Sequence, residues 1–353
     1  MLAEAVDAVI GIDTHRDSHE AEIADAAGKP IATMQIGSDS AGFAQLLAAI
    51  ADVTPGPRVA VSIEGSRSYG IGLARTLAAA GLLVIECEQP SRKQRRGKGK
   101  SDPIDAHLAV LAALRLDAGR LPVPRADGDR EALRILLGAR QEITAACTAQ
   151  GNRLRALLLS GDDAGRRAAR RTLSKTALAA LASCEPPARA SRDHIVRQSE
   201  IRRLALALAQ DRCQLKENRN QLLAIVDDIA PGLTSRYGVG PVSAAQAIVS
   251  FSHPGRCRNE AAFAALGGTS PLPTSSGKTV RHRLNRGGDR ALNRAIHVIA
   301  LTRIRSCPRT RAYVARRTAE GKTPREIRRC LKRYIARELC RQLNQSMKPP
   351  ASP

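Results

Sequence analysis

Hydrophobic and polar positions near the start of the chain follow a strand-like pattern. Residues 8–13 form an apolar run that ends in an aspartate, and residues 20–25 and 31–36 alternate between apolar and polar positions. An Ala-Gly-Lys-Pro turn separates the last two runs. Short alternating runs bounded by turn residues are typical of paired strands. The pattern therefore predicts an antiparallel meander of three strands.

A different pattern follows, in which helical and strand-like segments alternate. Residues 38–53 carry apolar side chains three and four positions apart, which predicts a helix. The next segments predict a strand, a helix, a strand and a helix, at 58–64, 69–80, 83–87 and 101–116. Together these elements predict an α/β domain of the RuvC or ribonuclease-H-like type over residues 1–120, with a mixed sheet and helices on both faces. A Rossmann fold is excluded, since it would begin β-α-β with a glycine-rich first turn.

Two long segments with leucine and isoleucine near heptad spacing occupy the middle of the chain. Residues 129–160 and 191–229 each predict a long helix, and a Pro- and Gly-containing linker precedes the first. This spacing predicts an α-helical coiled-coil arm, with its helices antiparallel, over residues 121–230. A plain helical bundle fits the same pattern.

The last third of the chain predicts a mainly α-helical domain over residues 231–346. Gly238 and Gly240 open a segment of small residues that resembles a helix-hairpin-helix, in which backbone N–H groups bind a phosphate. A plain helix-turn-helix is the alternative. Basic helices are expected from Arg290 onward, and the tail 347–353 is expected to be disordered.

Composition restricts the classes of function. The 353 residues carry a net charge of +23, which indicates a polyanionic partner such as DNA or RNA. Aromatic residues make up 2% of the chain, which disfavours binding mainly by aromatic stacking platforms. No apolar run could cross a membrane and no basic secretion signal opens the chain, so a cytoplasmic protein is expected. The eight widely spaced cysteines fit no zinc site and are expected to be buried, reduced thiols.

The charge is distributed unevenly. Residues 1–88 contain five Lys and Arg against twelve Asp and Glu, whereas residues 275–353 contain 21 against four. In the stretch 91–100, six of the ten residues are basic. Carboxylates repel phosphate, so a nucleic-acid-binding protein usually keeps them near its ligand in order to bind a divalent metal. An acidic face that never meets the ligand explains the charge equally well.

Four acidic residues coincide with the ends of predicted elements. Asp13 ends the first strand, Glu64 ends the fourth, and Asp102 and Asp105 lie three apart at the start of the last helix of the domain. In a ribonuclease-H-like sheet the first and fourth strands are neighbours, so these carboxylates would meet at one edge. There they would hold Mg²⁺ or Mn²⁺. Each acid taken alone also has a plain structural explanation, as a turn, cap or loop residue.

His15 and His19 lie four residues apart before the second strand. On a helix this spacing would suit a metal, but these residues fall in a turn. Both histidines are therefore expected at the surface, where at most they would contact phosphate.

A loop rich in Gly, Pro and Ser spans residues 267–277. A serine there is well placed to attack a phosphodiester, with Lys278, Arg281 and Arg283 stabilising the charge that develops. A polar loop that only binds phosphate fits the same residues. The residues expected to contact nucleic acid are Arg92, Lys93, Arg95, Arg96, Lys98, Lys100, Gly238, Gly240, Lys278, Arg281, Arg283, Arg286 and Arg290.

Five segments together resemble one protein family. They are GIDTH at 11–15, SIEGSRSYG at 62–70, KSDPIDAHLA at 100–109, GVGPVSAA at 238–245 and LGGTSPLPTSSGKTVRHRLNRGGDRALNRA at 266–295. In this order they are similar to the DEDD transposases of the bacterial insertion-sequence "one-ten" family, which are bridge-RNA-guided recombinases. The similarity runs from about residue 8 to residue 340.

The resemblance implies a DNA transposase and site-specific recombinase. It implies that the four acidic residues form the family's metal-binding tetrad and that Ser276 is the nucleophile, with its neighbour Ser275 as the alternative. A covalent phosphoserine intermediate, donor and target DNA and a structured guide RNA are further implications. So are homodimers that assemble into tetramers, and a location in the bacterial cytoplasm at the nucleoid.

Two other functions are compatible with the residues themselves. A RuvC-like structure-specific nuclease would hydrolyse DNA junctions with metal-activated water, and it would need the carboxylates but not the serine. A non-enzymatic nucleic-acid-binding protein would use the carboxylates only as an acidic surface. The serine loop favours the recombinase over the nuclease, and the four placed carboxylates disfavour the binding protein.

Overall fold

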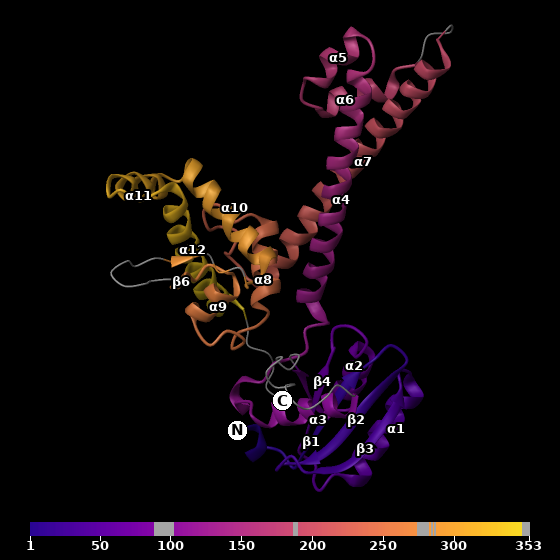
Figure 1. The fold of residues 1–353 in the computed structure, drawn as a ribbon, viewed down its shortest axis with the longest axis vertical. Helices are drawn as coiled ribbons and strands as arrows, with labels where there is room; N and C mark the ends of the chain where they lie inside the picture. Colours follow the sequence, from indigo (N-terminus) through magenta and orange to yellow (C-terminus); the bar gives the residue numbers. More distant parts are fainter. Residues whose placement is uncertain (88–101, 186–189, 274–281, 284, 286, 348–353) are drawn as a thin grey trace. The chain divides into compact units, whose positions relative to one another are not determined.

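The computed structural model divides the chain into two compact units (Figure 1). It describes residues 1–87, 102–185, 190–273, 282–283, 285 and 287–347. The first unit comprises residues 1–131 and 251–266 and a C-terminal piece that begins at Cys340, and the second unit comprises residues 132–250 and 267–339. The division of the chain into a RuvC-like domain, an arm, a serine-bearing domain and a tail stays a prediction.

A mixed five-stranded sheet forms the centre of the first unit. Its strands are β1 (Ala8–Thr14), β2 (Ser18–Asp25), β3 (Pro30–Gly37), β4 (Val59–Glu64) and β5 (Leu83–Cys87). Their order is β3-β2-β1-β4-β5, with antiparallel pairing among β1, β2 and β3 and parallel pairing of β4 with both β1 and β5. The central strand β1 is buried along its whole length. The predicted meander and the neighbouring first and fourth strands are thus confirmed.

Helices cover both faces of this sheet, as predicted. They are α1 (Ser40–Val53), α2 (Ile71–Ala79) and α3 (Asp102–Leu114), with short 3₁₀ turns at Leu2–Glu4 and Ala118–Arg120. One core joins α1 and α2 to the face of β1 that carries Ile10 and Ile12. The other joins α3 to the opposite face through Val9 and Val110. The central strands are therefore covered on both sides, which is why apolar residues occupy successive positions in β1.

His19 corrects the expectation that both histidines lie at the surface. Its side chain is fully buried and stacks on Phe43 of α1, with ring centroids 6.1 Å apart. Neither ring nitrogen has a hydrogen-bond partner among the described groups. His19 lies on the face of β2 that carries Ala21 and Ile23, and α1 covers this face, so the ring is buried with them. His15, in contrast, is about half-exposed, as predicted.

We expect His19 to make the stability of the first unit depend on pH. Burial lowers the pKa of His19, and the nearby backbone of Ser18 offsets only part of this effect. The folded pKa then lies below the unfolded value of about 6.5. Stability is therefore complete above that pH and is lost as the pH falls toward the folded pKa, because only the unfolded chain binds the proton.

Denaturant unfolding between about pH 7.5 and pH 5 measures this effect. His19→Phe should lose less stability on acidification than the wild type, because phenylalanine keeps the stack on Phe43 and cannot bind a proton. The half-exposed His15→Gln is the control and should keep most of the wild-type dependence, because the charge of His15 makes the smallest contribution to the lowered pKa of His19. Equal pH dependence of His19→Phe and the wild type would contradict the assignment.

The second unit contains the predicted arm. Its helices are α4 (Gly128–Leu159), α5 (Asp163–Ala169), α6 (Lys175–Ser183) and α7 (Arg192–Ile229). Asn218 Nδ2 donates to the Leu136 carbonyl at 2.9 Å, and Arg140 donates to the Leu215 carbonyl at 2.9 Å. Residue numbers thus rise along α4 as they fall along α7, which confirms an antiparallel pair (Figure 1).

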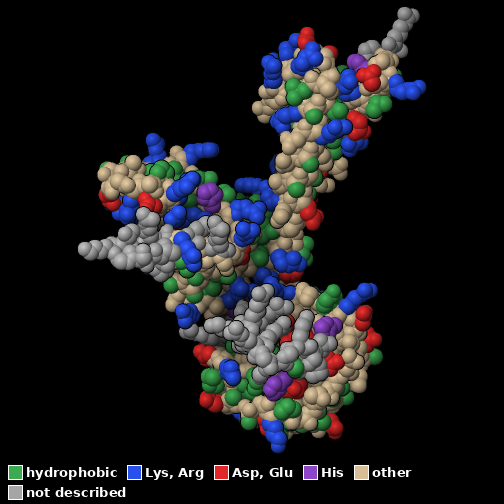
Figure 2. Space-filling model, in the orientation of Figure 1, with side chains coloured by type: hydrophobic (Ala, Val, Ile, Leu, Met, Phe, Trp, Pro, Cys, Tyr) green, Lys and Arg blue, Asp and Glu red, His purple; other side chains and the backbone are tan. Residues whose placement is uncertain are grey.

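The remaining elements are mostly helical, as predicted. They are α8 (Pro241–Phe251), α9 (Glu260–Leu266), β6 (Leu272–Pro273), β7 (His282–Arg283), α10 (Arg290–Ser306), α11 (Pro308–Ala319) and α12 (Pro324–Ser346). Figure 2 shows Lys and Arg side chains over the arm and over α10 to α12. None of the described helices is long and apolar enough to cross a membrane. The expectation of buried thiols is wrong for Cys184 and Cys213, which are exposed.

Candidate active site

The ends of β1 and β4 bring two of the predicted acidic residues next to each other. The strands run parallel with Ile12 opposite Ile63, so Asp13 and Glu64 follow at the same edge of the sheet. The hydroxyl of Thr14 donates to the Glu64 carbonyl oxygen at 2.7 Å, which ties the two strand ends together. Asp13 is 7% exposed and Glu64 is half-buried. The sheet therefore places two largely shielded carboxyl groups side by side.

Asp105 is positioned by the packing of α3 against β1. It lies in the first turns of α3 and is 6% exposed. A Cβ atom on Gly11 would lie 2.1 Å from the carbonyl oxygen of Ala106 and 2.8 Å from the amide of Val110. The glycine thus allows the backbone of α3 to contact β1 two residues before Asp13. The start of α3, with its acidic residue, is held close to the strand that carries Asp13.

A contact between a buried carboxylate and a histidine, not identified from the sequence, holds the same helix to the sheet. Glu22 of β2 lies opposite Gly11 and is 5% exposed. Its Oε1 lies 2.6 Å from Nδ1 of His107 in α3. A buried carboxylate needs such a partner because its desolvation is costly. The alternation of residues 20–25 assigns Glu22 to a polar position, so that pattern did not indicate its burial or its contact with His107.

The fourth acid of the predicted tetrad, Asp102, begins α3, and its side chain lies outside the described residues. Among the side chains that are described, no group of three or more His, Cys, Asp and Glu residues could hold a metal ion. Asp13 Oδ2 lies 3.3 Å from Nε2 of His15. The shielded carboxylates nevertheless have the chemistry of ligands for a divalent cation, since Mg²⁺ and Mn²⁺ prefer carboxylate oxygens.

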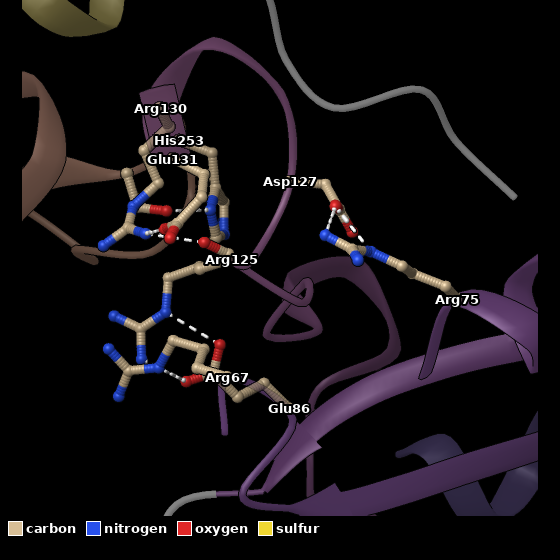
Figure 3. A network of polar contacts seen from close by, with 9 residues as sticks. Arg67, Arg75, Glu86, Arg125, Asp127, Arg130, Glu131 and His253 are labelled. Atoms are coloured by element: carbon tan, nitrogen blue, oxygen red, sulfur yellow. Dashed lines mark hydrogen bonds and ion pairs between the residues drawn. The ribbon is translucent and has the colours of Figure 1, made fainter. Parts of the chain in front are cut away.

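A basic cluster in the same unit surrounds Glu86 of β5 (Figure 3). Glu86 accepts a hydrogen bond from Nε of Arg125 at 2.8 Å and pairs with Arg67 at 3.1 Å. Burial raises the pKa of Glu86, but the hydrogen bond and charge of Arg125 and the charge of Arg67 outweigh it, so the pKa is lowered. Burial and the charge of Arg125 lower the pKa of Arg130 to about 10. The guanidinium groups outnumber the carboxylates here, and Arg67 follows Glu64 by three residues, so the cluster can attract a phosphate toward the acidic edge.

The predicted serine nucleophile lies outside the described residues. Residues 274–281 include both candidates, Ser275 and Ser276, as well as Lys278 and Arg281. The basic stretch 88–101 and Arg286 also lie outside. The strands that flank the serine segment are described. They pair antiparallel, with Leu272 opposite Arg283, so the two ends of the segment are held together.

Two helices hold the chain that leads into the serine segment. Asn293 of α10 donates to the Gly267 carbonyl at 2.6 Å, and Lys332 of α12 donates to Asn293 Oδ1 at 2.6 Å. Arg333 donates to the hydroxyl of Ser270. Burial lowers the pKa of Lys332. The approach to the serines is therefore fixed by polar contacts to α10 and α12.

The predicted phosphate-binding turn and two predicted arginines lie in the second unit. Gly238 has a φ of +76° and packs against α10, where Ile299 O and Arg303 Cγ would each lie 3.3 Å from an added Cβ. A side chain at that φ would be strained. Gly240 directly precedes α8, and Arg283 and Arg290 are exposed.

A mixed ribonuclease-H-like sheet with acidic strand ends, joined to a helical arm and a basic helical domain, defines a class of nucleic-acid-processing enzymes. Comparison with protein families narrows this class. Residues 10–161 match the family profile of IS110-type DEDD transposases, and residues 230–315 match a profile described as "Transposase IS116/IS110/IS902 family". The chain belongs to the IS110 ("one-ten") family and is a DNA transposase, which confirms the resemblance found in the sequence.

A relative supports this assignment. The chain is 26% identical over 372 residues to the "Insertion element IS110 uncharacterized 43.6 kDa protein" of Streptomyces coelicolor. The alignment covers 91% of this chain and 90% of the relative. Membership of the family implies DNA as a partner and a general dependence on divalent metal.

Proposed function

We propose that this transposase cuts and rejoins DNA through a covalent phosphoserine intermediate. Ser276 is the nucleophile, with Ser275 as the alternative, and the carboxylates that support it are those of Asp13, Glu64, Asp102 and Asp105. The observation that carries the proposal is the joint placement of Asp13 and Glu64 on adjacent parallel strand ends, with α3 packed beside them at Gly11. An acidic edge in so basic a protein is best explained by metal-assisted phosphoryl transfer.

In the proposed reaction the serine oxygen attacks a DNA phosphorus atom. The new bond joins Ser Oγ to phosphorus as the bond from phosphorus to the leaving sugar oxygen breaks, and the serine proton is transferred to solvent or to a neighbouring base. Attack by the hydroxyl of another DNA end then reverses these changes and releases the serine. Because each step exchanges one phosphodiester for another, no external energy source is needed.

The four carboxylates are proposed to hold two Mg²⁺ or Mn²⁺ ions. When bound, the ions would neutralise phosphate charge and lower the pKa of the attacking hydroxyl. The contacts of Gly11 and the pair Glu22–His107 keep α3 in place for this role. The guanidinium of Arg67 is proposed to orient the phosphate near Glu64.

The proposal requires the serine segment and the carboxylates to meet at one phosphodiester, although they belong to different parts of the chain. We propose that the two come from different subunits of a homodimer that assembles into a tetramer with donor and target DNA. A structured guide RNA is part of the same proposal. Its support is the family membership and the net charge of +23, which suits more than one polyanionic partner.

Removal of divalent metal is expected to abolish DNA cleavage. Excess chelator should stop the reaction and added Mg²⁺ should restore it, because four carboxylates at one edge cannot bind phosphate without cations. Asp102→Asn should be inactive in Mg²⁺ with an unchanged circular dichroism spectrum. Asp17→Asn is the control, since Asp17 is an exposed acid of the same unit, and it should cleave normally. Full cleavage in chelator, or by Asp102→Asn, would remove the tetrad from the mechanism.

A further inference from the structure

A groove in the second unit lies outside the site described above. Its accessible volume is about 1160 Å³, and its walls are residues 134–148 of α4, Arg219 of α7, the segment 234–240, α8 and α10. Pockets for small ligands usually measure about 300–1000 Å³. The groove therefore has room for a few nucleotides.

Arginine is the one charged residue type among the described residues that line this groove. The arginines are Arg134, Arg140, Arg219, Arg236 and Arg294. They come from α4, α7, the segment before α8 and α10, so the fold gathers them from distant parts of the sequence. Figure 2 shows blue side chains between the base of the arm and α10. No described Asp or Glu lines the groove, so its surface attracts an anion.

Two of these arginines are held close to each other. The backbone carbonyl of Leu215 and the amide oxygen of Asn218 accept hydrogen bonds from Arg140, at 2.9 and 3.4 Å. Burial and the charge of Arg219 together lower the pKa of Arg140. The guanidinium of Arg140 is therefore held in place on α4, and it is repelled by that of Arg219 on α7. A bound phosphate would relieve this repulsion, so the two arginines together favour phosphate binding.

The rim of the groove carries an aromatic side chain on a fixed loop. Tyr237 is 48% exposed, and its carbonyl oxygen accepts a hydrogen bond from Arg303 Nε at 2.8 Å. Arg303 also pairs with Glu338 at 2.7 Å, so its charge is balanced within the protein. An exposed ring on a fixed loop can stack on a nucleic-acid base at little entropic cost.

We propose that this groove binds a short unpaired segment of a nucleic-acid strand, with phosphates on the arginines and one base stacked on Tyr237. The cationic lining selects a phosphodiester backbone. The exposed ring favours an unpaired base, because the bases of a duplex stack on one another and do not offer a face to the ring. RNA and DNA strands share this chemistry, and the experiments below separate them. The inference goes beyond the proposed function and does not depend on the serine chemistry, because its readout is binding.

The first test compares two double variants of the full-length chain. Arg219→Gln with Arg294→Gln removes two groove charges. Arg202→Gln with Arg305→Gln removes two exposed charges from the same two helices outside the groove, with Arg202 about 25 Å along α7 from Arg219.

Binding of labelled 12-nucleotide RNA and DNA strands is measured by fluorescence anisotropy at several salt concentrations. The groove variant should bind at least tenfold more weakly. The slope of log affinity against log salt should fall by about 1.4, since each contact to a single strand releases about 0.7 counterion. The control variant, Arg202→Gln with Arg305→Gln, should lose less affinity and should show a smaller change in the salt slope. Equal effects of the two double variants would overturn the proposal.

A steric variant tests the volume of the groove without changing charge. Gly138 lies on the groove face of α4, and nothing lies within 4 Å of an added Cβ. Gly138→Leu should therefore fold normally and bind both strands more weakly than the wild type. Unchanged binding by this variant would mean that the strand lies elsewhere.

A photo-crosslinker identifies the strand. With p-benzoylphenylalanine in place of Tyr237, irradiation should join the protein to the RNA strand, the DNA strand or both, and the label on the product identifies which. The same adduct should form when Ser276 is also replaced by alanine, so a failure of the serine mechanism would not affect this result. No adduct with either strand, or an adduct only to a second copy of the chain, would overturn the proposal.

Discussion

Replacing Ser276 with alanine is expected to abolish the covalent protein–DNA adduct and all recombination. In the proposed reaction the serine oxygen forms the bond to phosphorus, and no other group is proposed to take that place. Loss of an essential nucleophile lowers rates on the order of 10,000-fold or more. Binding of DNA and RNA should be unchanged, because the hydroxyl contributes little to contacts dominated by basic residues.

Ser275→Ala is the matched control, since it removes the same group one residue away. It should keep the adduct and recombination. If Ser275→Ala is inactive and Ser276→Ala is active, Ser275 is the nucleophile. If both variants cleave normally and leave free DNA ends, the RuvC-like nuclease is the correct function.

The same variant tests whether the site is shared between subunits. Neither Ser276→Ala nor Asp13→Asn protein should recombine DNA alone. A mixture should regain part of the wild-type activity, because some assemblies then combine an intact serine with intact carboxylates from different subunits. A mixture that stays inactive would place both halves of the site within one subunit.

Replacing Gly11 with alanine is expected to destabilise the first unit and to abolish cleavage. The new Cβ would lie 2.1 Å from the Ala106 carbonyl oxygen, so α3 must move away from β1. Overpacking against a backbone atom costs about 3 kcal/mol. The shift would also displace Asp105 relative to Asp13. Denaturant unfolding and a DNA cleavage assay measure the two effects.

Gly119→Ala is the control for this prediction. Gly119 is in the same unit, and an added Cβ would meet only the Asp117 carboxylate at an ordinary 3.5 Å. Its effect on the free energy of unfolding should stay within about 0.5 kcal/mol. A Gly11→Ala protein as stable and active as this control would contradict the close packing of α3 on β1.

The order of elements in the first unit was predictable from the sequence because each element carries a local signal. Alternating runs predicted the meander, and apolar spacing predicted α1. Asp39 caps this helix, and its carboxylate accepts a hydrogen bond from the Gly42 amide at 2.8 Å. The neighbouring positions of Asp13 and Glu64 followed from the order of the strands. These features depend on residues close together in the chain or on a rule about topology.

Other features could not be predicted because they depend on tertiary packing. His19 lies on the face of β2 that carries Ala21 and Ile23, and its burial comes from Phe43 of α1, a contact that the sequence of one strand does not reveal. The pairing of Glu22 with His107 joins residues 85 positions apart. The arginine groove of the second unit likewise gathers side chains from segments that lie far apart in the sequence.

The most direct test of the central claim is mass spectrometry of the protein after reaction with a nicked DNA substrate that prevents rejoining. Digestion with protease and nuclease should leave one peptide that carries a nucleotide. A phosphoserine intermediate predicts that the nucleotide is attached through a phosphodiester to Ser276, or to its neighbour Ser275. Cleaved DNA with free ends and no modified peptide would contradict a phosphoserine intermediate and would identify a hydrolytic enzyme.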